Sequence, residues 1–69
     1  MTSAQCREAR NLLHWSREHL AALSNVPLDA LITFERIGSA DPEQVSRIGL
    51  RLAHAGVEFT DGGVRLKEP

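Results

Sequence analysis

The 69-residue sequence predicts a single, mainly α-helical domain of four helices followed by a short β-hairpin. Apolar residues recur three and four positions apart through most of the chain, which is the period of a helix buried along one side. From about residue 57 the period changes to two, and two alternating runs flank Asp61-Gly62-Gly63. Such runs around a Gly-rich turn are typical of a β-hairpin. We therefore expect a helical part over about residues 4–56 and a hairpin over about residues 57–66.

The first two helices are expected to meet at a short corner. Thr2 or Ser3 can cap a helix over about residues 4–13, and Ser16 can cap a second helix that ends near Leu23. The first helix carries an apolar stripe that we expect to face the core: Cys6, Ala9, Leu12 and Leu13.

Turn-forming residues separate the second helix from the third. Asn25 tolerates a left-handed backbone and can end a helix, while Pro27 suits a first helical position because it has no N–H to leave unpaired. The third helix is expected over about residues 27–36, with Gly38 as its C-cap. Two helices joined across three or four residues predict a helix-turn-helix.

The fourth helix has a clear start signal. Asp41 is expected as its N-cap, Pro42 as its first residue and Gln44 as the residue that closes a capping box. Apolar residues at helical spacing follow: Val45, Ile48, Leu52 and Ala55. Arg47 and Arg51, four apart, form a basic strip that we expect to be a solvated helix face.

The hairpin should present two different faces. Its apolar face comprises Val57, Phe59, Val64 and Leu66. Glu58 and Arg65 should lie on the other face. A lone hairpin is marginally stable in water, so this one needs a partner surface. Either it folds over the first and fourth helices, or its edge pairs with another copy across a two-fold axis, so the four apolar residues are candidates for tail packing or dimerisation.

Composition narrows the function classes. Hydrophobic residues make up 42% and charged residues 25% of the chain, which is typical of a soluble globular protein. One cysteine, Cys6, and three scattered histidines suggest no disulfide, metal or cofactor, and no run of residues has the length of a membrane span. We expect a cytoplasmic protein that is not an enzyme. The net charge of −1 lacks the basic excess of a strong DNA binder.

The central segment resembles a known family. The motifs are WSREHLA at residues 15–21 and NVPLDALITFE at residues 25–35. The positions that carry the resemblance are Arg10, Trp15, Ser16, Leu20, Ala21, Val26, Leu31, Phe34 and Glu35. In this order and spacing, the chain from about residue 5 to residue 56 resembles the Cro/phage-repressor (XRE) helix-turn-helix family of small bacterial regulators. The resemblance implies a homodimeric transcriptional regulator that binds double-stranded DNA and inserts its third helix in the major groove.

The resemblance also implies roles for individual residues. The positions that face bases are Pro27, Leu28, Asp29, Ile32 and Thr33. The positions that face phosphates are Ser16, Arg17, Arg36 and Ser39. Arg10 and Glu35 correspond to a partly buried structural ion pair between the first and third helices. For Arg17, solvation beside Glu18 remains the alternative to phosphate contact.

The third helix leaves a second function open. Of its base-facing positions, only Thr33 is a conventional hydrogen-bonding contact to bases or phosphates. Leu28 and Ile32 are four apart and form an apolar ridge, which usually indicates a protein partner when exposed. The alternative is a protein-interaction module that sequesters another regulator or protein through this ridge.

Overall fold

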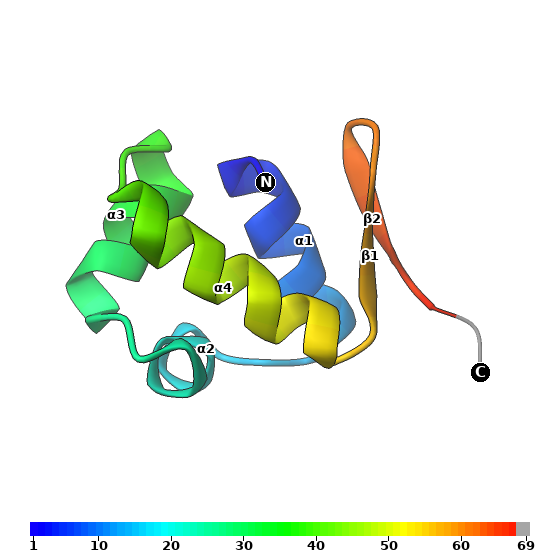
Figure 1. Cartoon of the computed structure of the whole chain (residues 1–69), viewed down its shortest axis with the longest axis horizontal. Helices are drawn as coiled ribbons and strands as arrows, with labels where there is room; N and C mark the ends of the chain where they lie inside the picture. The colour runs from blue at the N-terminus through cyan, green and yellow to red at the C-terminus, as the bar shows by residue number, and fades with distance from the viewer. Residues whose placement is uncertain (68–69) are drawn as a thin grey trace.

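The computed structural model describes residues 1–67, which fold into a helical body with a β-hairpin at its side (Figure 1). The elements are α1 (Ser3–Leu12), α2 (Arg17–Ser24), α3 (Leu28–Ile37), α4 (Pro42–His54), β1 (Val57–Thr60) and β2 (Gly63–Leu66). α1 lies between α3 and the hairpin, and α4 crosses the front of the helical body. The predicted fold class, four helices followed by a hairpin, is confirmed.

α1 begins one residue earlier than expected because of its cap. The Thr2 hydroxyl accepts a hydrogen bond from the Gln5 N–H, and the Gln5 side chain accepts one from the Thr2 N–H, which completes a capping box. Cys6 and Ala9 are fully buried as expected. The prediction for Leu12 is wrong: its side chain is exposed, because this end of α1 is only partly covered by the hairpin.

Single left-handed residues separate the helices. Asn25 (φ 54°) ends α2 and Gly38 (φ 76°) ends α3, both as expected. Pro27 is the N-cap of α3, not its first helical residue, because its ψ of 140° is extended. The fourth helix lacks the expected capping box: the Asp41 carboxylate accepts a hydrogen bond from the Glu43 N–H at 2.9 Å.

The core lies where the four helices meet the start of the hairpin. Its buried apolar residues are Cys6, Ala9, Leu20, Ala21, Val26, Leu31, Phe34, Ile48, Leu52 and Val57. Trp15 and Val45 are half-buried and pack against this cluster. Each helix thus contributes its apolar stripe to one core, which fixes α2 and α3 relative to each other.

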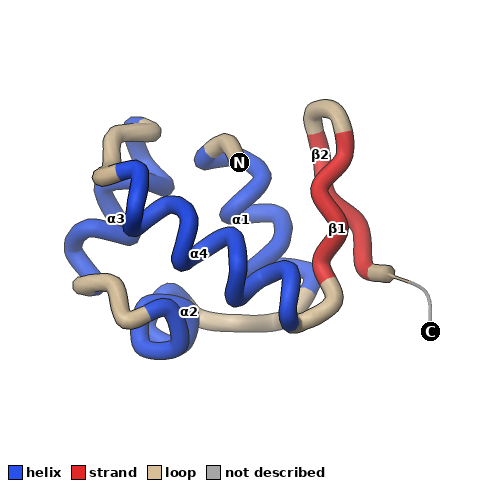
Figure 2. The backbone as a smooth tube through the Cα atoms, viewed as in Figure 1, coloured by secondary structure: helices blue, strands red, loops and turns tan. Residues whose placement is uncertain are grey.

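The hairpin folds over α1 and α4 (Figure 2). Val57 pairs with Leu66 and Phe59 with Val64, so these four residues share one face, while Glu58 and Arg65 form an ion pair on the other face. Gln5 of α1 donates hydrogen bonds from Nε2 to the carbonyls of Thr60 (2.9 Å) and Gly63 (3.0 Å), which anchors the turn to α1. This is the tail packing expected as one alternative. Dimerisation through the hairpin edge stays a prediction.

Candidate nucleic-acid interface

α2 and α3 form a tight helix-turn-helix. Only residues 25–27 separate the two helices. The left-handed Asn25 redirects the chain, and the Val26 N–H donates to the Ala21 carbonyl at 3.0 Å. The Val26 side chain is buried and anchors the turn in the core. The inner face of α3 is equally well held, because Leu31, Phe34 and Glu35 are all buried.

The predicted base-facing residues lie together at the start of α3. We call Leu28, Asp29, Ile32 and Thr33 the outer face of α3, because their spacing places them on one side of the helix. All are exposed except Ile32, which is half-buried, and Pro27 is exposed directly before them. The Leu28 side chain is 37% exposed. The Leu28–Ile32 ridge expected from the sequence is therefore accessible mainly at Leu28.

The chemistry of the outer face is mixed. The Thr33 hydroxyl can donate and accept hydrogen bonds. The Asp29 carboxylate accepts a hydrogen bond from the Ala30 N–H at 2.9 Å, so it occupies the positive end of the helix itself. A phosphate placed at the start of α3 would meet this negative charge, so the outer face suits base edges and methyl groups better than the DNA backbone.

Glu35 is the centre of a buried ionic cluster. Its carboxylate accepts hydrogen bonds from Arg10 Nε (3.0 Å), Arg10 Nη2 (3.2 Å) and Arg17 Nε (3.2 Å), and from the Cys6 thiol at 3.5 Å. Glu35 is 2% exposed and Arg10 13% exposed, whereas Arg17 is 49% exposed. Arg7 also donates to the Glu35 backbone carbonyl. The cluster therefore joins α1, the start of α2 and the end of α3.

Opposing effects set the ionisation of this cluster. Burial alone would raise the pKa of the Glu35 carboxyl, but the hydrogen bonds and charge of Arg10, followed by the bonds from Arg17 and Cys6, together hold that pKa below its usual 4.5. Burial, reinforced by the charge of Glu35 and the hydrogen bond to it, raises the pKa of the Cys6 thiol from 9.0 to about 12. At neutral pH, Glu35 is an anion and Cys6 is a neutral donor.

The predicted phosphate-facing residues lie in two places, at the start of α2 and near the end of α3. Ser16 caps α2 and accepts the His19 N–H at 3.0 Å, and Arg17 is the first residue of that helix. Glu35 binds Arg17 through Nε, and the two terminal nitrogens of the guanidinium have no hydrogen bond within residues 1–67. Arg36, next to Glu35, and Ser39, after α3, are both exposed. The Arg17–Glu35 bond thus places the start of α2 beside the second half of α3.

Sequence reasoning missed several members of the cluster. It paired Glu35 with Arg10 but placed Arg17 at phosphates or in solvent. It also treated Cys6 only as a small core residue. Arg7 and Arg10 are three apart on one face of α1, and this spacing could have indicated that both reach the same partner. The bond from Arg17 had no comparable signal, because it depends on how α2 packs against α3.

Within residues 1–67, no three His, Cys, Asp or Glu side chains are grouped closely enough to hold a metal ion. None of the helices in the same range is both long and apolar enough to cross a bilayer. Comparison of the chain with protein-family models, curated proteins and solved structures finds no match.

Proposed function

We propose that this protein is a transcriptional regulator of the XRE type that binds double-stranded DNA as a homodimer in the cytoplasm. The observation that carries the proposal is the tight helix-turn-helix, in which the exposed face of α3 lies beside an arginine fixed at the start of α2. In this class of motif the second helix enters the major groove while the first contacts the backbone. Two copies related by a two-fold axis would place their α3 helices about one turn of DNA apart.

Arg17 and the start of α2 would hold the DNA backbone. The N-terminus of a helix presents unpaired N–H groups and a positive dipole, both of which favour a phosphate. Arg17 is bound to Glu35 through Nε, and its terminal nitrogens, which have no hydrogen bond within residues 1–67, would donate to a phosphate. Ser16, Arg36 and Ser39 are exposed and would add further phosphate contacts. Phosphate contacts set the orientation of the protein without reading the sequence.

The outer face of α3 would read bases. Thr33 can exchange hydrogen bonds with base edges, and Leu28 and Ile32 fit against thymine methyl groups. The Asp29 carboxylate only accepts hydrogen bonds, so it would pair with a base amino group such as that of cytosine, and Pro27 would fill space at the entrance to the groove. Because the net charge is −1, we expect modest affinity that depends strongly on salt.

A second candidate function is a protein-interaction module. It is favoured by the exposed Leu28 side chain at the start of α3 and by the net charge of −1. In this case Leu28 and Ile32 would dock against an apolar surface of another regulator. The two functions differ in one simple observable, because only the first requires binding to DNA at low salt.

The test is a DNA titration at several salt concentrations with two variants that each lose one positive charge. Arg17→Gln removes the proposed phosphate contact, and Lys67→Gln removes an exposed charge at the end of the hairpin. We expect Arg17→Gln to weaken binding to every sequence and to reduce the slope of log K against log salt by about 0.9, the value for one phosphate contact. Lys67→Gln should leave the slope unchanged.

The outcomes separate the two functions. If the slope of log K against log salt is unchanged in Arg17→Gln, Arg17 does not contact a DNA phosphate. Absence of binding by the unsubstituted protein even at low salt would contradict the DNA-binding function and favour the interaction module. Thermal melting of Arg17→Gln shows whether loss of the Glu35 contact has altered the fold.

A further inference from the structure

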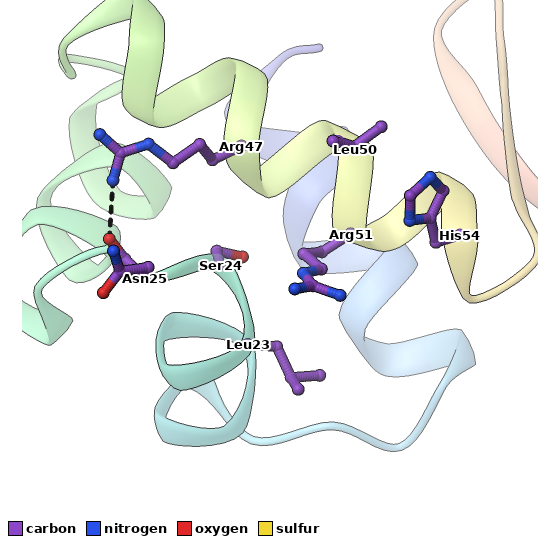
Figure 3. Close-up of a pocket in the computed structure, with 7 residues that line it drawn as sticks. All are labelled: Leu23, Ser24, Asn25, Arg47, Leu50, Arg51 and His54. Atoms are coloured by element: carbon purple, nitrogen blue, oxygen red, sulfur yellow. Dashed lines mark hydrogen bonds between the residues drawn. The ribbon is translucent and has the colours of Figure 1, made fainter.

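A groove between α2 and α4 lies outside the proposed DNA interface. It has a volume of about 310 Å³ and is bounded by the C-terminal end of α2, the following turn, and the second half of α4 (Figure 3). We call it the α2–α4 groove. Its lining has three properties that together point to a specific kind of ligand.

The first property is an exposed apolar wall on each side. Leu23 of α2 is 36% exposed and Leu50 of α4 is 56% exposed, and both side chains line the groove. Neither belongs to the buried core. Exposed apolar side chains such as these gain stability when a partner covers them and removes their surface from water.

The second property is a positive charge that no acidic side chain of residues 1–67 balances, that of Arg51. None of the lining residues is acidic, and four of them come from α4: Arg47, Leu50, Arg51 and His54. Arg47 is held in place by hydrogen bonds to the Asn25 carbonyl (2.8 Å) and to the Glu43 carboxylate (2.9 Å). Arg51 is exposed and has no hydrogen bond or ion pair within residues 1–67, so its guanidinium is available to an anionic partner.

The third property is a buried hydroxyl that lacks a partner. Ser24 is 3% exposed and lines the groove, and its Oγ makes no hydrogen bond within residues 1–67. In Figure 3 the Ser24 side chain points from α2 toward α4, into the space beside Arg51. An unsatisfied buried hydroxyl is costly, and a carboxylate or carbonyl oxygen that entered the groove would accept its hydrogen bond.

We propose that the α2–α4 groove binds an acidic, leucine-bearing amphipathic helix of another protein. Apolar anchors of such a helix, spaced three or four residues apart, would cover Leu23 and Leu50. A carboxylate beside the anchors would accept hydrogen bonds from Arg51 and from the Ser24 hydroxyl. A DNA backbone is a poorer match because phosphodiesters offer no apolar surface to cover the two leucines. The proposal does not depend on DNA binding by α3.

The experiment measures binding of a fluorescein-labelled helical peptide of about 14 residues, with leucines four apart and glutamates between them, by fluorescence anisotropy. A control peptide carries glutamine at each glutamate position. The protein variants are Arg51→Gln and Ser24→Ala, with Lys67→Gln as the matched loss of one charge outside the groove. Arg51 is exposed, so its replacement should not disturb folding.

We expect the acidic peptide to bind more tightly than the glutamine peptide. Arg51→Gln should weaken its binding about tenfold, the usual effect of losing one charge-assisted hydrogen bond. Ser24→Ala should weaken binding about threefold to tenfold without lowering the melting temperature, because the hydroxyl has no partner in the free protein. Lys67→Gln should bind as the unsubstituted protein does.

Several results would overturn the proposal. Equal binding of the two peptides, or unchanged affinity in Arg51→Gln or Ser24→Ala, would exclude the groove as an acidic site. Displacement of the peptide by duplex DNA would assign the groove to phosphates. Self-association of the protein that rises with concentration and disappears in Arg51→Gln would assign it to a second copy of this chain.

Discussion

Replacing Glu35 by alanine should destabilise the domain severely. Glu35 is 2% exposed and accepts two hydrogen bonds from Arg10, which is itself only 13% exposed. Removing one partner of a buried pair costs about 3–5 kcal/mol, because the remaining charge stays buried without compensation. Arg10 keeps its hydrogen bond to the Trp15 carbonyl, and the half-exposed Arg17 regains water, so we place the loss near the lower end, at about 3 kcal/mol.

Such a loss is large for a domain of this size. A chain of 69 residues has a free energy of unfolding of roughly 3–10 kcal/mol. At about 4–8 °C for each kcal/mol, the melting temperature should fall by about 10–25 °C. The assay is urea and thermal unfolding at neutral pH, followed by far-ultraviolet circular dichroism. A double-mutant cycle with Arg10→Ala isolates the energy of the pair itself.

A matched control comes from the hairpin. Glu58 pairs with Arg65 at the surface, and Glu58→Ala should cost less than about 1 kcal/mol because both side chains are accessible to water. Equal losses in Glu35→Ala and Glu58→Ala would refute the view that the buried cluster stabilises the fold.

The cluster also predicts how stability depends on acid. The pKa of Glu35 lies below 4.5 in the folded protein, so the folded state binds fewer protons than the unfolded state around that pH. Its contribution should therefore be present above about pH 4.5 and be lost as the pH falls through the folded pKa. Glu35→Gln should remove this part of the acid dependence.

Three further predictions concern other residues. Cys6→Ala should reduce the loss of stability above pH 9: the thiol pKa rises from 9.0 to about 12 on folding, so the unsubstituted protein should lose about 1 kcal/mol more than the variant between pH 9 and pH 10 in urea titrations. Gln5→Ala should cost about 1–2 kcal/mol and accelerate hydrogen exchange in the hairpin, because the two turn carbonyls lose their donor. Asn25→Ala should cost about 1 kcal/mol because φ is 54°, whereas Asn25→Gly should be nearly neutral by thermal melting.

Much of the fold could be predicted because its signals are local. Asn25 and Gly38 mark helix ends through backbone preferences that act within one turn. The alternation after residue 56 similarly predicts which hairpin residues share a face, and the pairing of Val57 with Leu66 and of Phe59 with Val64 agrees with it. The predictions were wrong in detail at the starts of two helices, α3 and α4. At the start of α3, an extended ψ makes Pro27 the cap, and at the start of α4 the side chain of Asp41 bonds Glu43 without help from Gln44.

Contacts between distant segments were harder to predict. Leu12 follows the helical stripe of α1, but its exposure depends on how far the hairpin reaches along that helix. The bond from Arg17 to Glu35 and the position of Ser24 beside α4 likewise follow from helix packing, which periodicity within one helix does not specify. The residues on the outer face of α3 could be predicted because their spacing within one helix places them together. The contact between Arg17 and Glu35 beside them could not, because it joins two helices.

The measurement that tests the central claim most directly is a nuclear magnetic resonance titration of the nitrogen-labelled protein with duplex DNA from the region flanking its own gene. The proposed function predicts that the largest amide shifts fall on residues 28–33 of α3 and at the start of α2 around Arg17. It also predicts that a scrambled duplex produces smaller shifts at the same concentration and salt. Shifts confined to α1 and the hairpin, or no shifts at low salt, would contradict insertion of α3 into a DNA groove.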